Sequence, residues 1–206
     1  VEEISERRRV REEIRTSIGR AREELQEARE IAEQLDVDHL VIQTHETDRP
    51  LYQQNTTARC YVCKQELFIE LDRLALARQA NVVLYGVLSD DRLEDRPGHR
   101  AALEAGVRAP LQEAGFEKWE VRELARRLGL PNWNKPQNSC LSSRIPHGSE
   151  VTSAKLQQVE SAEAFLKAHG FAVVRVRHVG AHARIEVGGE EVSRFHDPAL
   201  CASLLE

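Results

Sequence analysis

Hydrophobic positions in the first part of the chain repeat with a helical period. From residue 14 their spacing alternates between four and three, and the residues between them are mainly Glu and Arg. The apolar positions are Ile14, Ile18, Ala21, Leu25, Ala28, Ala32 and Leu35. This spacing predicts one long helix over residues 2–35. It fits a coiled-coil partner or an amphipathic helix lying on a sheet; because the repeat is short and its residues are small, we favour the helix on a sheet.

Two later apolar runs predict buried strands. Residues 39–44 and 81–86 each contain a continuous apolar run rather than an alternating pattern, and a helix predicted from Cys60 to about Gln79 separates them. Continuous apolar strands separated by a helix are typical of a parallel sheet covered on both faces. Ligands of such sheets bind beyond the carboxyl ends of the strands, so residues 88–98 are expected near a site. Residues 45–59 predict a polar loop, and residues 107–111 a short strand.

The second half of the chain has a different pattern. Residues 118–128 predict a helix that ends before Gly129, and residues 131–148 predict an irregular segment. A helix is expected from Thr152 or Ser153 to about Ala168, and a last helix near Pro198. Between these helices, two alternating runs predict an antiparallel pair over residues 172–178 and 183–187.

These patterns together predict an α/β fold in which a parallel sheet domain precedes a small α+β lobe. The change from continuous to alternating strands near residue 150 marks the expected boundary. The predicted parts are a charged helical extension over 1–19, the sheet domain over 20–148 and the lobe over 149–206.

Composition narrows the class of protein. In 206 residues, 41% hydrophobic content is enough for a core, and 5% aromatic content means that the core is mainly aliphatic. A net charge of −5 argues against a strongly basic nucleic-acid surface. The sequence shows no long apolar stretch and no signal-like segment, which predicts a cytoplasmic protein without a membrane partner. It contains no methionine, so we expect either a removed initiator or an excerpt of a longer protein.

Cys60 and Cys63 form a C-x-x-C pair at the start of a predicted helix. The positive end of the helix dipole favours thiolates there, and the flanking Arg59 and Lys64 are expected to act in the same direction. The pair fits ligation of a metal or cluster, a dithiol redox couple, or two small buried residues. We favour ligation, because soft thiolates select zinc and iron–sulfur species and a reducing compartment disfavours a structural disulfide.

Cys140 lies in an irregular segment beside Ser142, Ser143 and Arg144. Hydroxyl and cationic neighbours would stabilise a thiolate and position an anionic substrate. Taken alone, this cysteine also fits a small buried residue.

Two clusters of charge are further candidates. Asp90, Asp91, Asp95 and Arg96 lie within one loop after a predicted strand, where carboxylates can hold Mg²⁺ with a phosphorylated ligand or form a solvated acidic turn. On a later predicted strand, two arginines alternate with valines and therefore share one face. These are Arg175 and Arg177. Such a pair can bind a phosphate or carboxylate, or form an exposed polar face. The histidines show no metal-binding spacing.

Several segments in combination resemble the LarE-type sulfur transferases of the PP-loop ATP pyrophosphatase superfamily. They occur in the family's order between about residues 20 and 190. The matching segments are Arg59-Cys-Tyr-Val-Cys-Lys64, Gly86-Val-Leu-Ser-Asp-Asp91, Asp95-Arg-Pro-Gly98, Ala109-Pro-Leu111, Pro131-Asn-Trp-Asn-Lys-Pro136, Cys140-Leu-Ser-Ser-Arg-Ile-Pro146 and Val174-Arg-Val-Arg-His178.

The resemblance implies a sulfurtransferase in the synthesis of the nickel-pincer nucleotide cofactor. In this family, a pyridinium dicarboxylate mononucleotide is activated by AMP transfer from ATP and then receives sulfur as a thiocarboxylate. In one branch a single cysteine surrenders its own sulfur, and Cys140 matches that cysteine. In another branch three cysteines hold a 4Fe–4S cluster. The pattern here implies the cluster branch, with Cys60, Cys63 and Cys140 as ligands.

The resemblance also implies roles for other residues. Cys140 and Glu163 would lie at the reacting centre, and Arg144, Arg175 and Arg177 would bind the substrate phosphate. The expected nucleotide and Mg²⁺ site consists of Lys64, Gly86, Asp90, Asp91, Asp95 and Arg96. Homo-oligomers are expected from the family.

Two family features are absent from this sequence. These are the phosphate loop Ser-Gly-Gly-x-Asp-Ser, whose backbone N–H groups would hold the ATP phosphates, and a C-terminal tail. We therefore expect an incomplete PP-loop sheet and weak or no ATP binding by this chain. The alternatives are a tRNA-thiolation enzyme of the same superfamily, which the acidic net charge disfavours, and an ATP-incompetent domain that binds a cluster or a partner.

Overall fold

The alternating pattern after residue 170 does form an antiparallel hairpin. A computed structural model describes residues 19–91 and 96–205, and the contacts among them divide into two units. The first, here the hairpin unit, contains residues up to Asp36, Asn138–Pro146 and the chain from Ser153 onward. The second, here the helical unit, contains Val37–Gln137 and His147–Thr152. Of the predicted extension over residues 1–19, residues 1–18 lie outside the described residues, and the predicted domain boundaries stay a prediction.

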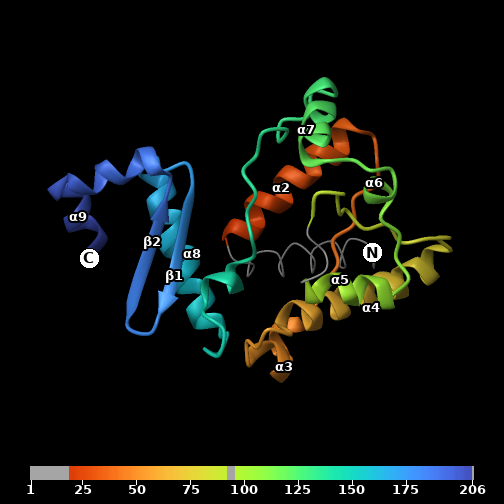
Figure 1. Ribbon diagram of the computed structural model, residues 1–206, viewed down its shortest axis with the longest axis horizontal. Helices are drawn as coiled ribbons and strands as arrows, with labels where there is room; N and C mark the ends of the chain where they lie inside the picture. The colour runs from red at the N-terminus through yellow and green to blue at the C-terminus, as the bar shows by residue number, and fades with distance from the viewer. Residues whose placement is uncertain (1–18, 92–95, 206) are drawn as a thin grey trace, which may run out of the picture. The chain divides into compact units, whose positions relative to one another are not determined.

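The hairpin unit is built on strands β1 (Val174–Val179) and β2 (His182–Val187), with Val176 opposite Ile185. Helix α8 (Ser153–Ala168) lies against this hairpin (Figure 1). Because side chains alternate along a strand, Val174 and Val176 of β1 face inward and pack with Leu166, Phe171 and Leu200. The remaining elements are α2 (Gly19–Gln34), the 3-10 turns η2 (Leu141–Arg144) and η3 (Gly189–His196), and α9 (Pro198–Leu205).

Helix α2 confirms the described part of the predicted long helix. Within the hairpin unit it contacts α8, so the expected packing of this helix on a sheet is not found there. The apolar face predicted for this helix is only partly covered: Ala32 is buried, whereas Leu35 is 44% exposed.

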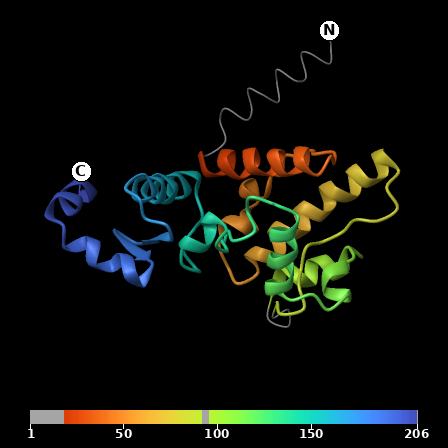
Figure 2. The same cartoon turned by 90° about the horizontal axis from the view of Figure 1, so that it is seen from above.

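The helical unit is organised by α4 (Arg59–Arg78), one continuous helix that begins at the C-x-x-C pair (Figure 2). It ends at Gln79, whose φ of 54° is left-handed. Helix α5 (Pro97–Glu104) packs on α4 through a small core of Phe68, Ala101 and Ala102. The other elements are η1 (Glu46–Asp48), α3 (Pro50–Gln53), α6 (Pro110–Glu113) and α7 (Lys118–Arg127). The predicted helices over 60–79 and 118–128 are therefore confirmed.

The predicted parallel strands do not form a sheet among the described residues. Residues 39–44 form no ladder, and near residues 81–86 the pairing is a single parallel bridge between Leu84 and Arg108. Leu40 is 46% exposed and Leu84 60% exposed, so the two runs are not buried as expected. A parallel strand is stable only when neighbouring strands satisfy its backbone and cover its faces. The described fold is rich in helices and contains one two-stranded antiparallel sheet.

Two predicted irregular or extended segments also differ. The expected loop over 45–59 contains the helical turns η1 and α3. The expected strand over 107–111 gives way to α6, because Pro110 occupies the first turn of that helix, where its missing N–H is not needed.

Candidate functional site

The C-x-x-C pair occupies the first turn of α4 in the helical unit. Cys60 is exposed and Cys63 is half-buried, and neither forms a disulfide. At this i,i+3 spacing both side chains lie on one side of the helix. Gly98 of α5 lies against this turn: a Cβ at Gly98 would be 3.1 Å from Lys64 Cγ and 3.4 Å from the Cys60 carbonyl oxygen. The close approach of α5 to the cysteine turn thus depends on this glycine.

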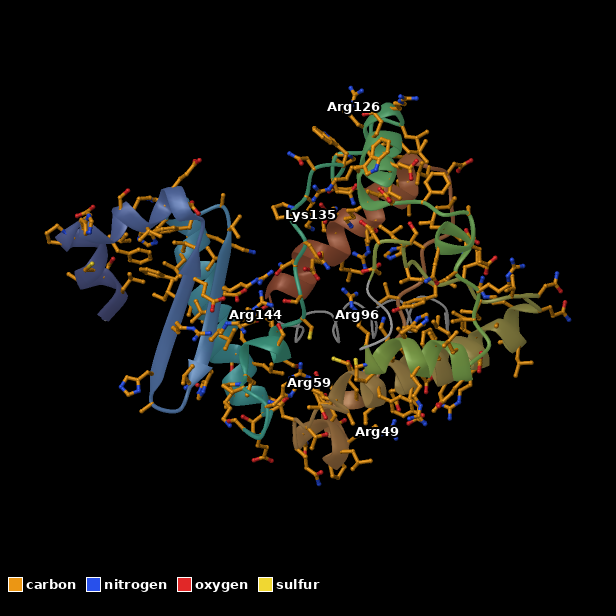
Figure 3. All side chains as sticks on the ribbon, viewed as in Figure 1. Arg49, Arg59, Arg96, Arg126, Lys135 and Arg144 are labelled. Atoms are coloured by element: carbon orange, nitrogen blue, oxygen red, sulfur yellow. The ribbon has the colours of Figure 1, made fainter. Side chains whose placement is uncertain are left out.

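The two cations beside the pair have partners of their own. Arg59, at the beginning of α4 (Figure 3), is 5% exposed and donates to the Asn55 carboxamide oxygen. The ammonium of Lys64 lies over the Tyr85 ring, 5.1 Å from its centroid. Part of the positive charge that the sequence places at the thiols is therefore engaged elsewhere.

Cys140 lies in the hairpin unit, directly before η2, and its side chain is exposed. The loop around it is held by Arg144, which Figure 3 labels on η2. Arg144 Nη1 donates to the carbonyl oxygens of Ser139 at 2.7 Å and Cys140 at 3.1 Å. The Arg144 side chain is 1% exposed, so its guanidinium faces the protein interior rather than an open site.

Glu163 is the buried partner of Arg144. Its Oε1 accepts from Arg144 Nε at 2.7 Å and from the Val176 backbone N–H at 3.1 Å. Glu163 belongs to the inner stripe of α8, with Leu156, Val159 and Leu166, at helical spacing. The stripe that buries the apolar side chains therefore buries this carboxylate as well.

The two arginines of β1 share the outer face of the hairpin, as predicted. Arg177 Nε donates to Glu186 Oε1 at 2.6 Å, and Arg184 Nη2 is 3.0 Å from the same oxygen. The hydrogen bond from Arg177 holds the pKa of Glu186 below its usual value. Arg177 Nη1 also lies 3.4 Å from the Ser143 carbonyl oxygen. This arginine face thus carries Arg175, Arg177 and Arg184, of which Arg177 and Arg184 contact the Glu186 carboxylate, and Arg177 lies close to the loop of Cys140.

The acidic loop after residue 88 is held by internal hydrogen bonds. Asp90 Oδ2 accepts from the Lys118 backbone N–H at 3.2 Å, at the start of α7. Asp91 accepts from the Leu88 N–H at 3.1 Å and from Arg96 Nη1 at 2.9 Å. Asp95 lies outside the described residues. At Gly86 a Cβ would meet nothing within 4 Å, so sterics do not require glycine there.

The structure therefore brings the predicted residues together in two sets. Cys140, Arg144, Glu163 and Arg177 are linked in the hairpin unit, whereas Cys60, Cys63 and Lys64 lie in the helical unit. Within residues 19–91 and 96–205, no group of three or more His, Cys, Asp or Glu side chains is arranged to hold a metal ion. The donor chemistry fits an iron–sulfur cluster, because C-x-x-C thiolates are its usual ligands. In the same described ranges, no helix has the length and apolar character needed to span a bilayer.

Comparison with known proteins finds relatives of this chain. No family model matches it. It is 46% identical over 184 residues to the uncharacterized protein slr1717 of Synechocystis, covering 89% of this chain and 69% of that protein. It is 40% identical over 141 residues to the pyridinium-3,5-bisthiocarboxylic acid mononucleotide synthase of Lactiplantibacillus plantarum. This chain is a LarE-type relative.

The match to the LarE-type synthase covers 68% of this chain and 51% of the synthase. A third relative, the uncharacterized protein MJ0830 of Methanocaldococcus jannaschii, is 31% identical over 65% of this chain and 52% of its own length. The chain thus spans about half the length of these two relatives.

Sequence reasoning missed two residues that organise the sites. Asn55 is fully buried and joins the start of α4 to residues 147–152, since its Nδ2 donates to the Ser149 carbonyl oxygen at 2.8 Å. Glu186 is the shared partner of two arginines. Only Glu186 could have been found from the sequence: because side chains alternate along a strand, Glu186 and Arg184 lie on the same face of the hairpin.

Proposed function

We propose that this chain takes part in sulfur transfer to the carboxyl groups of a pyridinium dicarboxylate mononucleotide, in the synthesis of the nickel-pincer cofactor. The relative from Lactiplantibacillus plantarum is named for the bisthiocarboxylic product of such a transfer. The observation that carries the proposal is the exposed Cys140 on a loop fixed next to the arginine face of β1. A reactive sulfur group and an anion-binding face are the two requirements of this chemistry.

The arginine face supplies the binding half of the proposal. Arg175 and Arg177 would bind the phosphate of the mononucleotide, because guanidinium groups match phosphate oxygens in a bidentate manner. Arg177 is already oriented by Glu186 and by the Ser143 carbonyl. A phosphate bound here would lie beside the loop that carries Cys140.

The cysteines supply the sulfur half. Cys60, Cys63 and Cys140 would hold a 4Fe–4S cluster, which when bound offers an exchangeable sulfide. The acceptor carboxyl must be activated first, as an adenylate. The acceptor carbon then gains a C–S bond and loses its C–O bond to AMP, which leaves with the electron pair. Activation requires ATP and Mg²⁺, and we propose that a PP-loop-like fold holds both; the parallel strands of such a fold are not formed among the described residues.

The cluster is tested by anaerobic reconstitution with iron and sulfide. We expect visible iron–sulfur absorbance in the wild type and its loss in Cys63→Ala and Cys140→Ala. Cys201→Ala is the matched control, because Cys201 lies in α9 and its thiol donates to the Phe195 carbonyl oxygen at 3.0 Å. Absence of absorbance in the wild type, or equal loss in Cys201→Ala, contradicts the cluster.

Sulfur transfer is tested with the synthetic adenylate of the mononucleotide, which bypasses the ATP step. Mass spectrometry should show replacement of oxygen by sulfur in the product with the reconstituted wild type and not with Cys140→Ala. Replacement accompanied by loss of the Cys140 sulfur in cluster-free protein would favour the single-cysteine route instead. No replacement under either condition contradicts the proposed function.

A further inference from the structure

We propose that Arg144 and Glu163 are positioning residues: a buried ion pair that fixes the Cys140 loop to helix α8 and strand β1. This differs from the phosphate-binding role that the sequence resemblance implies for Arg144. That a fixed Cys140 serves sulfur transfer rests on the proposed function. That the ion pair fixes the loop does not depend on it.

The burial of the pair is the first observation. The side chains of Arg144 and Glu163 are 1% and 3% exposed, and their atoms approach to 2.7 Å. A buried charge is tolerated only when it is paired and its remaining donors or acceptors are satisfied. An arginine that bound a substrate phosphate would need a face open to the ligand, and this guanidinium has almost none.

The second observation is how Arg144 uses its other donors. Nη1 donates to Ser139 Oγ at 2.8 Å and Ser143 Oγ at 3.0 Å, in addition to the carbonyls of Ser139 and Cys140. Nη2 donates to Asn138 Oδ1 at 3.0 Å. The four acceptors around Nη1 share its two N–H groups through bifurcated bonds, and the planar fork of the guanidinium holds them in one fixed arrangement that a lysine ammonium cannot reproduce. The loop that carries Cys140, residues 138–145, therefore surrounds the Arg144 guanidinium and bonds to it.

The third observation is that Glu163 links this cation to the hairpin. The same Oε1 that receives Arg144 Nε also accepts from the backbone N–H of Val176, the residue between Arg175 and Arg177. From the other side, Arg177 Nη1 reaches the Ser143 carbonyl oxygen at 3.4 Å. One carboxylate thus sets the position of the cysteine loop relative to the arginine face.

Hydrogen exchange of the full chain tests the fixing of the loop. Arg144→Lys keeps the charge but not the fork of donors, and Glu163→Gln keeps the shape but not the charge. Both should speed amide exchange in a peptide covering residues 138–145 at least tenfold, because Ser143 and Ile145 N–H groups bond within this loop at 3.0 and 3.2 Å. Exchange in a peptide covering α9 should not change.

Arg194→Lys is the matched control. Arg194 also donates to a backbone carbonyl in the hairpin unit, that of Gly170, at 3.0 Å, but not in the cysteine loop. It should leave exchange in residues 138–145 at the wild-type rate. Wild-type exchange of this loop in Arg144→Lys and Glu163→Gln, or equal acceleration in α9, overturns the proposal.

A binding measurement separates positioning from phosphate binding. Calorimetry with the pyridinium dicarboxylate mononucleotide should give the wild-type Kd for Arg144→Lys and at least a tenfold weaker Kd for Arg175→Ala. A weaker Kd for Arg144→Lys with an unchanged loop contradicts positioning. If the wild type does not bind the mononucleotide, the proposed function fails, and the exchange experiment still decides whether the pair fixes the loop.

Discussion

At the scale of single residues, Asn55 connects distant parts of the helical unit. Its carboxamide donates to Ser149 and accepts from Arg59, and its φ of 52° lies in the left-handed region, which asparagine tolerates better than most residues. Its backbone carbonyl also accepts from the Gly148 N–H at 3.1 Å. One residue therefore anchors both the start of α4 and residues 147–152.

Asn55→Ala should lower the free energy of unfolding by about 2–3 kcal/mol, because it leaves the buried Arg59 without this acceptor and adds backbone strain. Urea denaturation measures the change. Asn55→Gly removes the strain but not the lost hydrogen bonds, so it should recover part of the loss. The exposed Asn134 is the control, and Asn134→Ala should change stability by less than about 0.5 kcal/mol. Equal effects at the two positions would contradict the assigned role.

Glu186 provides a pH-dependent prediction. The hydrogen bond from Arg177 lowers its folded pKa below the usual 4.5, so its stabilising contribution is present above pH 4.5 and is lost as the pH falls through the lower folded pKa. The side chains are 32% and 34% exposed, so the contribution should be below about 1 kcal/mol.

Melting temperature against pH measures this contribution for wild type and Glu186→Gln. The wild type should be the more stable at neutral pH, and the gap should close as the pH falls below 4.5. A gap that is constant across this range would show that protonation of Glu186 is not its cause.

At the scale of elements, the first turn of α7 shows a carboxylate in a structural role. Asp90 accepts from the Lys118 N–H, and Glu120 Oε2 accepts from the Glu117 N–H at 2.9 Å. These bonds satisfy N–H groups that a helix leaves without internal partners. The position of Asp90 is thus explained without Mg²⁺.

Asp90→Ala should therefore destabilise the chain by about 1 kcal/mol and speed exchange in the first turn of α7. Asp90→Asn keeps an acceptor oxygen and should stay near the wild type. Denaturant unfolding compares the three proteins. If Asp90→Asn destabilises the chain as much as Asp90→Ala, the charge of Asp90, rather than its hydrogen bond, is the source of the stabilisation.

Local patterns predicted most of the helices and the hairpin because each depends on nearby residues. Helix α8 begins and ends where Ser153 and Gly170 indicate, and the alternating valines and arginines of β1 predicted its two faces. The prediction of parallel strands was wrong because such strands depend on residues that are distant in the sequence. An apolar run such as residues 39–44 becomes a buried strand only if partners distant in sequence pair with it.

At the scale of the whole molecule, each of the two units contains a core cluster among its described residues. Leu166 is fully buried in the hairpin unit with Phe171 and Val176, and Phe68 is 2% exposed in the helical unit with Ala101 and Ala102. Each unit thus has an apolar centre of its own.

Leu166→Ala and Phe68→Ala should each lower stability by about 3 kcal/mol, through lost burial and the cavity that remains. Hydrogen exchange should locate each effect: Leu166→Ala should act mainly on α8, β1 and α9, and Phe68→Ala mainly on α4 and α5. The double variant should show nearly additive losses. Equal acceleration in both units by either single change would contradict separate cores.

The sequence by itself determined the helices around the cysteines, the hairpin with its arginine face, and the combination of motifs that identifies the family. These features depend on local periodicity and on residue identity. Tertiary structure alone decided that Arg144 is buried against Glu163, that Asn55 joins two segments, and that Asp90 caps a helix. Burial and hydrogen-bond partners depend on which distant segments pack together, and a linear pattern does not contain that information.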